Sequence, residues 1–230
     1  MRSGATEKEQ KLIVIGDIHG KVDRYLKLLA RRPGEPSVQL GDFGIGFPGD
    51  GPLPALPDNA WFLRGNHDNP DAARSHENYI GDYGCRTIDG IRIFYLSGAW
   101  SFDQWCRTEG VNWWRTEELS FAELQAAVEL YTTTKPEIVL THDGPGEAIR
   151  ALFAAKSAHK DFARTATGGA LNAMLEAHRP RKWIFGHWHS RFRQKIGGTE
   201  FRCLPELGWC RIQGDFEASR SQRLLGKQRQ

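Results

Sequence analysis

The sequence predicts a layered α/β fold with mixed β-sheets. Short apolar runs typical of buried strands alternate with segments of helical periodicity along the 230 residues. Two hairpins are predicted, one turning at Asp89-Gly90 and the other at Gly197-Gly198. Hairpin strands are antiparallel, so the sheets are expected to be mixed rather than purely parallel. Polar clusters also follow several predicted strands, as at a ligand site on one edge of an open α/β sheet.

The elements of the first half follow in order. Leu12 to Ile15 is a continuous apolar run ended by Gly16, which predicts a buried strand. Lys21 to Arg32 carries apolar residues at helical spacing and stops at Pro33. Two further strands are predicted, on either side of a loop rich in glycine and proline: Ser37 to Leu40, Ala60 to Leu63, and the loop Gly44 to Pro57.

The second half continues the alternation. A helix is predicted over Leu119 to Tyr131, with Ser120 as its N-cap. The other predicted helices are Ala148 to Ala158 and Ala170 to Ala177. The predicted strands are Arg86 to Ile88, Ile91 to Leu96, Glu137 to Leu140, Lys182 to Phe185, Phe192 to Ile196 and Thr199 to Leu204.

Length and charge predict one domain over residues 12–213, between a flexible tail at 1–11 and a basic tail at 214–230. The net charge is +3, and four basic residues and one acid after position 216 account for all of it. The body of the chain is therefore neutral, which disfavours specific nucleic-acid binding.

Composition narrows the class of protein further. No apolar run approaches the ~18 residues of a membrane span, and the polar start shows no secretory signal, so we expect a cytoplasmic protein without membrane contact. The four cysteines form no CxxC pair and are expected to be reduced.

Five clusters carry the chemistry, each directly after a predicted strand. They contain carboxylates, imidazoles and one amide: Asp17 with His19, Asp42, Asn66 with His67 and Asp68, His142 with Asp143, and His187 with His189. Such a mixed oxygen and nitrogen set suits Mn, Fe, Zn or Ni, with manganese our first expectation. Two neighbouring ions need one bridging ligand, and the carboxylate of Asp42 has the two oxygens required.

These motifs, read as Asp17-x-His19, Gly41-Asp42, Gly65-Asn66-His67-Asp68, His142 and Gly186-His187-x-His189, resemble the signature blocks of the calcineurin-like metallophosphoesterase superfamily. The resemblance spans roughly Leu12 to Leu204. It implies a four-layer α/β/β/α sandwich, in which two facing mixed sheets are flanked by helices and the metals lie at the carboxyl ends of strands.

The resemblance also implies a role for each residue. One metal would be held by Asp17, His19 and His189, the other by Asn66, His142 and His187, and Asp42 would bridge them. His67 would lie near the leaving group as general acid, with Asp68 orienting and charging its imidazole. A hydroxide bridging the metals would attack phosphorus. The expected activity is hydrolysis of a phosphomonoester or phosphodiester, with a small phosphoester or nucleotide as substrate.

One departure bears on the substrate. Serine/threonine protein phosphatases continue the Gly-Asp block with a phosphate-gripping Asp-Arg-Gly, whereas Phe43 to Phe47 follow Asp42 here. A protein phosphatase therefore stays an alternative, and a catalytically silent binding scaffold a weaker one.

The segment 97–119 holds four of the eight tryptophans and is expected to be a cap-like insertion near the site. Its Arg107 is a candidate phosphate ligand, although an aromatic cluster that only pins a loop fits the composition better. Asp143 is equally a partner of a metal ligand or a turn former. The remaining histidines are expected to be solvated or capping: His76, His159 and His178.

Overall fold

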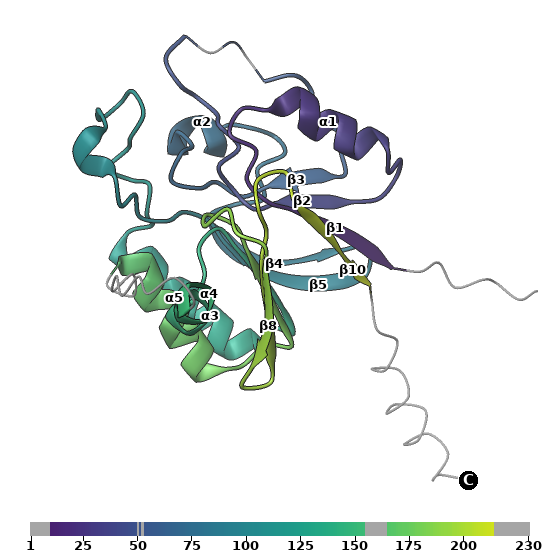
Figure 1. Cartoon of the computed structure of the whole chain (residues 1–230), viewed down its shortest axis with the longest axis vertical. Helices are drawn as coiled ribbons and strands as arrows, with labels where there is room; N and C mark the ends of the chain where they lie inside the picture. The colour runs from purple at the N-terminus through teal and green to yellow at the C-terminus, as the bar shows by residue number, and fades with distance from the viewer. Residues whose placement is uncertain (1–9, 50, 52, 155–164, 214–230) are drawn as a thin grey trace, which may run out of the picture.

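The computed structural model describes residues 10–49, 51, 53–154 and 165–213. The tails predicted at 1–11 and 214–230 therefore lie almost wholly outside the described residues, as does His159. Ten strands form two sheets among the described residues (Figure 1).

The first sheet has four strands in the order β10-β1-β2-β3. β1 pairs in parallel with β2 and antiparallel with β10, so the sheet is mixed as predicted. Its strands are β1 (Lys11–Ile15), β2 (Ser37–Gln39), β3 (Ala60–Phe62) and β10 (Trp209–Gln213).

The second sheet has six strands in the order β4-β5-β6-β7-β9-β8 and is also mixed. Its strands are β4 (Tyr83–Ile88), β5 (Ile91–Leu96), β6 (Ile138–Thr141), β7 (Lys182–Phe185), β8 (Phe192–Ile196) and β9 (Thr199–Cys203). Both predicted hairpins are present. Asp89 and Gly90 both have positive φ, as the tight turn between β4 and β5 requires.

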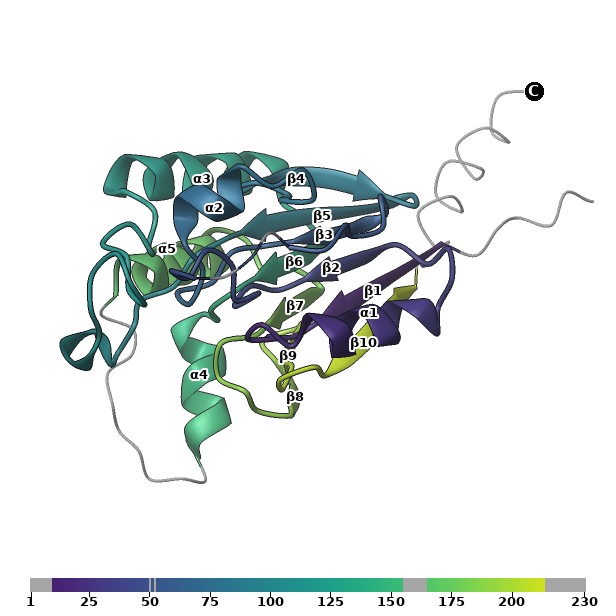
Figure 2. The ribbon, with the colours of Figure 1, turned by 90° about the horizontal axis from the view of Figure 1, so that it is seen from above.

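Helices cover the outer face of each sheet (Figure 2). The helices beside the first sheet are α1 (Val22–Ala30) and α2 (Pro70–Arg74), and those beside the second are α3 (Phe121–Thr134), α4 (Gly146–Phe153) and α5 (Ala166–Ala177). A 3₁₀ turn, η1 (Gln104–Cys106), lies in the segment 97–119, which projects beyond the sheets in Figure 1.

Alternation along β1 shows how the layers form. Leu12 and Val14 point into the core between the two sheets, while Ile13 and Ile15 pack with Tyr25 of α1 on the outer face. A third core lies between the second sheet and α3, α4 and α5, with Trp183 fully buried in it. Three cores separate four layers, so the predicted α/β/β/α sandwich is confirmed.

The structure extends several predicted elements and adds two. α5 begins at Ala166, and α4 occupies Gly146–Phe153 rather than the predicted Ala148 to Ala158, whose last residues lie outside the described part of the chain. The short α2 and the edge strand β10 were not predicted. All four cysteines are free, with Cys106 exposed.

Candidate metal centre

The predicted ligands meet where the strands of both sheets end. Asp17 follows β1, Asp42 follows β2, Asn66 follows β3, and His142 and His187 follow β6 and β7 of the other sheet. Two groups of side chains have their ligand atoms within 4.8 Å of one another: Asp17, His19, Asp42 and His189 in one, and Asp42, His142 and His187 in the other.

Asp42 belongs to both groups, and its two oxygens face different ways. Its Oδ2 lies 3.8 Å from His19 Nε2, whereas its Oδ1 lies 3.4 Å from His142 Nε2. Asp42 is also 1% exposed, so water cannot solvate the carboxylate freely. This orientation is the one that a bridging ligand needs.

Asn66 completes the second group. Its Oδ1 lies 3.1 Å from His142 Nε2 and 3.0 Å from His187 Nδ1. The amide orientation follows from its other end, because Asn66 Nδ2 donates to Ser101 Oγ at 2.9 Å and Ser101 Oγ donates to Glu117 at 2.5 Å. The oxygen of Asn66 is therefore the atom that faces the histidines.

The donor set fits a cation. His142 donates from Nδ1 to the Leu40 carbonyl at 2.7 Å, so its neutral ring presents a lone pair at Nε2. That lone pair faces the oxygens of Asn66 and Asp42, which are also acceptors. Asp42 Oδ1 also accepts from the His67 amide at 2.8 Å. The remaining lone pairs of these acceptors face one another and repel, and a divalent ion placed among them turns the repulsion into coordination.

Protonation states point the same way. Burial lowers the pKa of His142 to about 3 and takes the pKa of His187 well below its usual value, which keeps both rings in the neutral form that binds metal. Burial, with Asp17 and Asp68 nearby, raises the pKa of Asp42 well above its usual value. A bound cation removes the cost of holding such carboxylates ionised.

Glycines let the chain pass close to the ligands. A Cβ at Gly65 would collide with the Asp42 carboxylate and, at 2.5 Å, with His142 Nε2. A Cβ at Gly186 would likewise collide with the carboxylate of Asp17, whose oxygens accept from the His187 amide at 3.1 Å. Only glycine fits at these two positions.

Asp68 is the residue whose predicted contact was wrong. Its carboxylate accepts from the backbone amides of Gly44 at 2.6 Å, Gly65 at 2.8 Å and Phe43 at 3.1 Å, so it does not orient the His67 ring. Four converging amides, including that of Ile45, occupy its oxygens. Asp68 instead ties the loop after β2 to the loop after β3.

His67 faces Arg107. The guanidinium nitrogens Nη1 and Nη2 lie 2.9 and 3.0 Å from the two ring nitrogens, and Asp103 fixes the guanidinium with two bonds of 2.7 Å. Burial and the Arg107 charge lower the pKa of His67 to about 4, so the ring is neutral rather than the imidazolium predicted near neutral pH. Arg107 thus lies beside His67, and its contact with a substrate phosphate stays a prediction.

Sequence reasoning missed Ser101 and Glu117, which hold Asn66. Both are buried, and the serine amide also donates to Glu117 at 2.8 Å. No motif marks them, because they lie in the segment 97–119 and reach the site only through the fold. Asp143 Oδ1 accepts from both Trp188 Nε1 and the Gly144 amide at 2.7 Å, so it holds a residue between two predicted ligands and also forms a local turn.

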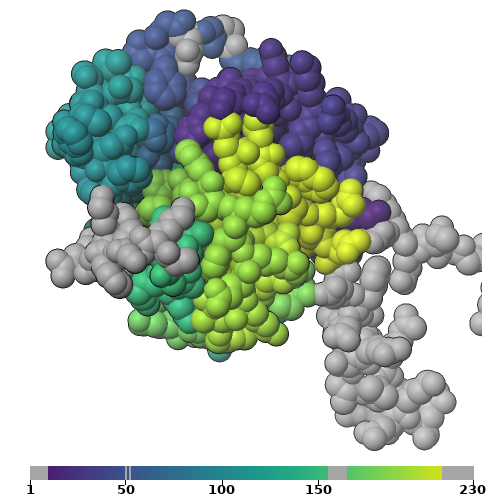
Figure 3. Space-filling view, viewed as in Figure 1, coloured from purple at the N-terminus to yellow at the C-terminus, as the bar shows by residue number. Residues whose placement is uncertain are grey.

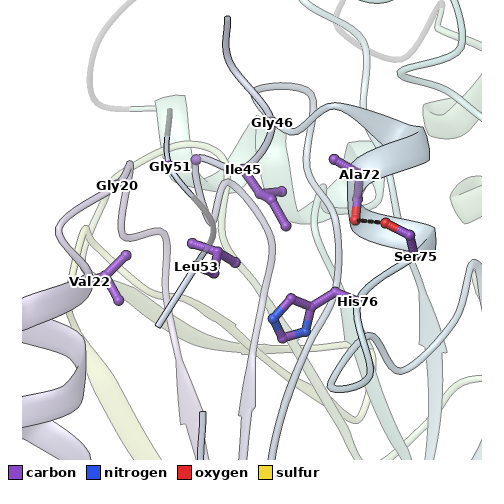
Figure 4. Close-up of a pocket in the computed structure, with 10 residues that line it drawn as sticks. Gly20, Val22, Ile45, Gly46, Gly51, Leu53, Ala72, Ser75 and His76 are labelled. Carbon is purple, nitrogen blue, oxygen red and sulfur yellow. Dashed lines mark hydrogen bonds between the residues drawn. The ribbon is translucent and has the colours of Figure 1, made fainter. Parts of the chain in front are cut away.

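A separate hollow of about 540 Å³ lies between α1, α2 and the loop after β2 (Figure 4). Val22, Ile45 and Leu53 line it, and the ring of His76 points into it. The Nδ1 atom of His76 accepts from the Asn78 amide at 3.1 Å, so the ring caps a local backbone amide, which is one of the two roles expected for it. None of the predicted metal ligands lines this hollow.

Comparison with known proteins agrees with this geometry. The family profile of calcineurin-like phosphoesterases matches residues 10–191. The chain belongs to this family. A lariat debranching enzyme from Entamoeba histolytica is 24% identical over 193 residues, which cover 74% of this chain and 53% of that enzyme.

A solved structure shares the fold. A Staphylococcus aureus protein described as a 5'-nucleotidase superimposes with a TM-score of 0.52 at 14% identity, over 92% of this chain and 52% of that one. The chain thus spans about half the length of both relatives. Within the described residues, no helix has the length and apolar character needed to cross a bilayer.

Proposed function

We propose that this chain is a dinuclear metal-dependent phosphoester hydrolase. The observation that carries the proposal is the carboxylate of Asp42, whose two oxygens face two separate groups of ligands. Asp17, His19 and His189 would complete one ion site, and Asn66, His142 and His187 the other. Two divalent ions, manganese first, would acidify a bound water and neutralise the phosphoryl oxygens when present.

The protein's own residues account for the rest of the chemistry. His67 lies at the rim of the ligand groups, with its ring centroid 5.3 Å from that of His19. Its ring is neutral beside Arg107, so it would take up a proton when an anionic phosphoester engages Arg107, and would then deliver that proton to the leaving oxygen. Arg107 lies against His67 and would hold a phosphoryl oxygen.

Arg107 takes the place of the arginine that is missing after Asp42. Its side chain is 14% exposed, which is enough for contact with a substrate while Asp103 fixes its direction. Changing Arg107→Ala should raise KM for a phosphoester, while Arg115→Ala, at a side chain 75% exposed in the same segment, should not. Equal KM values for both variants would remove Arg107 from this role.

The chemical class of substrate is a small phosphomonoester or a nucleotide-type phosphodiester. The loop after Asp42 supports this choice over a protein phosphatase, because its amides bind Asp68 and it carries no phosphate-gripping arginine. Hydrolysis of a phosphoserine peptide faster than that of bis(p-nitrophenyl) phosphate would favour the protein phosphatase instead.

The test combines metal content with activity. We expect about two transition ions per chain and manganese-stimulated hydrolysis of p-nitrophenyl phosphate or its bis ester. Asp42→Asn should lower both the metal content and the rate of hydrolysis, because an amide cannot bridge two cations as a carboxylate does. The matched control is Asp71→Asn on α2, at a side chain 95% exposed. No bound ions and no turnover in the wild type would instead support a binding scaffold.

A further inference from the structure

A second hollow of about 580 Å³ opens beside the metal centre, between the edge of one sheet and the edge of the other. The ends of β8 and β9 form one wall, and the loop 205–208 with the start of β10 forms the other. We call it the edge groove. Figure 3 shows this face, where the yellow 205–213 segment meets the yellow-green β8 and β9.

The edge groove lies next to loops that carry predicted metal ligands. Leu207, which lines it, donates its amide to the Asp17 carbonyl at 2.8 Å, and Gly16 donates to Gly208 at 2.8 Å. Arg191, on the opposite wall, follows His189 by two residues. The edge groove therefore adjoins the loops that carry Asp17 and His189, although none of the predicted metal ligands lines it.

Positive charge is concentrated there. Arg191, Arg193 and Arg202 all line the groove, and Arg193 lies directly opposite Arg202 in the β8–β9 pair. Like charges directly opposite each other destabilise a sheet. Glu200 lies 2.7 Å from Arg193 and 3.6 Å from Arg202, and Arg191 has no ion-pair partner among the described residues. The loop 205–208 carries one further carboxylate, Glu206, which pairs with Lys21.

The next strand adds to the excess. Lys182 of β7 lies opposite Glu200 in the register, and its pKa is lowered by burial and by the nearby charges of Arg181 and Arg202. Three cations, Arg193, Arg202 and Lys182, thus share Glu200 in this part of the fold. An anion in the edge groove would reduce that repulsion.

An exposed aromatic ring lies at the same place. Trp209 lines the edge groove and is 42% exposed, although it is a large apolar side chain. The Arg32 guanidinium lies over its ring at 3.8 Å from the centroid. Arg32 covers one face of the ring, so a base can stack only on the other face. A basic groove beside an exposed aromatic ring is typical of proteins that bind single-stranded nucleic acid, since arginines follow the phosphates and a base stacks on the ring.

We propose that the edge groove binds a single-stranded nucleic acid whose scissile phosphodiester lies at the metal centre. This inference rests on the proposed function, which it narrows from small phosphodiesters to a strand with further phosphates beyond the scissile one. The neutral body inferred from the sequence hides the groove, because acids elsewhere on the surface cancel its charge.

The test measures binding of a fluorescent ten-nucleotide phosphorothioate oligothymidylate to the manganese-loaded protein by anisotropy. Arg191→Glu should raise Kd about tenfold or more and flatten the dependence of log K on log salt by roughly 0.7 for each lost phosphate contact. Arg92→Glu on β5 is the matched control, exposed and four strands away from β8 in the sheet. An equal effect of the two variants would overturn the proposal.

Trp209→Ala separates nucleic acid from a simple polyanion. Loss of a stacked base should raise Kd about tenfold, whereas Phe121→Ala, at a ring 82% exposed on α3, should leave Kd unchanged. Inorganic polyphosphate that competes as well as the oligonucleotide, with no effect of Trp209→Ala, would show that the groove takes any polyanion and would contradict the proposal.

Wild-type hydrolysis of bis(p-nitrophenyl) phosphate keeps the two proposals apart. That ester has one phosphate and does not need the edge groove. Manganese-dependent hydrolysis without oligonucleotide binding would remove this inference and keep the proposed function, whereas absence of hydrolysis would remove the proposed function. Melting temperatures of Arg191→Glu and Trp209→Ala identify any variant that fails to fold.

Discussion

Four of the predicted ligand residues have a backbone conformation that costs free energy. His19, Asp42, His187 and His189 all have φ between 44° and 61°, in the left-handed region that non-glycine residues rarely adopt. Each such residue costs on the order of 1 kcal/mol or more. These turns aim the four side chains into one crevice directly after their strands, which is a reason for the fold to tolerate the strain.

The contacts of His67 decide how its role is tested. His67→Ala removes the proposed proton donor but no metal ligand, so turnover of an alkyl phosphodiester should fall ~10²- to 10⁴-fold while metal content stays unchanged. Rates measured on a nitrophenyl ester should fall less, because its leaving group needs no proton. An unchanged rate on the alkyl ester would exclude His67 as the acid.

The Glu117–Ser101–Asn66 chain predicts a selective effect on one ion. Ser101→Ala leaves Asn66 Nδ2 without its partner and frees the amide to turn, so the ion at Asn66, His142 and His187 should bind about 10- to 100-fold more weakly. Isothermal titration calorimetry of the metal-free protein with Mn²⁺ measures the affinity of each ion.

Ser75→Ala on the exposed end of α2 is the control for this variant, since Ser75 Oγ donates to the local Ala72 carbonyl and to no other group in the described part of the chain. The other ion should bind Ser101→Ala as it binds the wild type. Equal weakening of both ions would mean that the serine supports the fold in general rather than the direction of Asn66.

At the scale of elements, α3 shows local sequence and structure in agreement. Ser120 accepts from the Glu123 amide at 3.3 Å, Glu123 accepts from the Ser120 amide at 2.8 Å, and the capping box predicted in part from Ser120 is complete. The helix ends at Thr134, and its C-cap, Lys135, has φ of 42°.

Loss of this cap should be measurable. Ser120→Ala should lower the free energy of unfolding by about 1 kcal/mol, because the first turn of α3 then loses a partner for its amides. Urea denaturation checks it, with Thr132→Ala on the exposed face of α3 as the control. A midpoint equal to that of the wild type would contradict the assigned cap.

Two elements show why local signals fail. α2 has only five residues, too few for apolar periodicity, and its sole sequence signal is Asn69 before Pro70, which caps it. β10 follows Gly208, and its alternation of exposed and buried residues is short. β10 is defined by its pairing with β1, some 200 positions earlier in the sequence, and no local pattern contains that information.

At the scale of the whole molecule, Arg64 joins three parts of the fold. This side chain is fully buried, and it donates to Asp82 before β4 at 2.9 Å and to the Glu117 carbonyl of the segment 97–119 at 2.6 Å. Asp82 also accepts from Arg74 of α2 at 2.9 Å. The junction connects the loop after β3, the second sheet and the projecting segment.

The junction predicts acid sensitivity. Burial pushes the pKa of Asp82 up, but hydrogen bonds and charges from Arg74 and Arg64 outweigh it, so the pKa is lowered. A carboxyl with a lowered folded pKa stabilises the protein above its unfolded pKa of about 3.9, and this contribution is lost as pH falls through the lower folded value.

Asp82→Asn should therefore lower the free energy of unfolding at pH 7 by about 1.5 to 3 kcal/mol and remove part of its decline below pH 4. Urea denaturation at pH 7, 5 and 3 measures both effects. Asp23→Asn, on the exposed surface of α1, is the control. If the difference in unfolding free energy between the wild type and Asp82→Asn stays constant from pH 7 to pH 3, Asp82 is not the group responsible for the acid sensitivity.

The sequence by itself determined the ligand types, their order and the strands that they follow, because strand alternation and glycine-flanked polar clusters are local signals. Only the tertiary structure decided which atoms meet. Asp68 accepts from backbone amides rather than contacting His67. The segment 97–119 places Arg107 against His67 and Ser101 against Asn66, and the edge groove lies between the edges of the two sheets. Those contacts join residues distant in the chain, and their geometry depends on how the two sheets pack rather than on any local pattern.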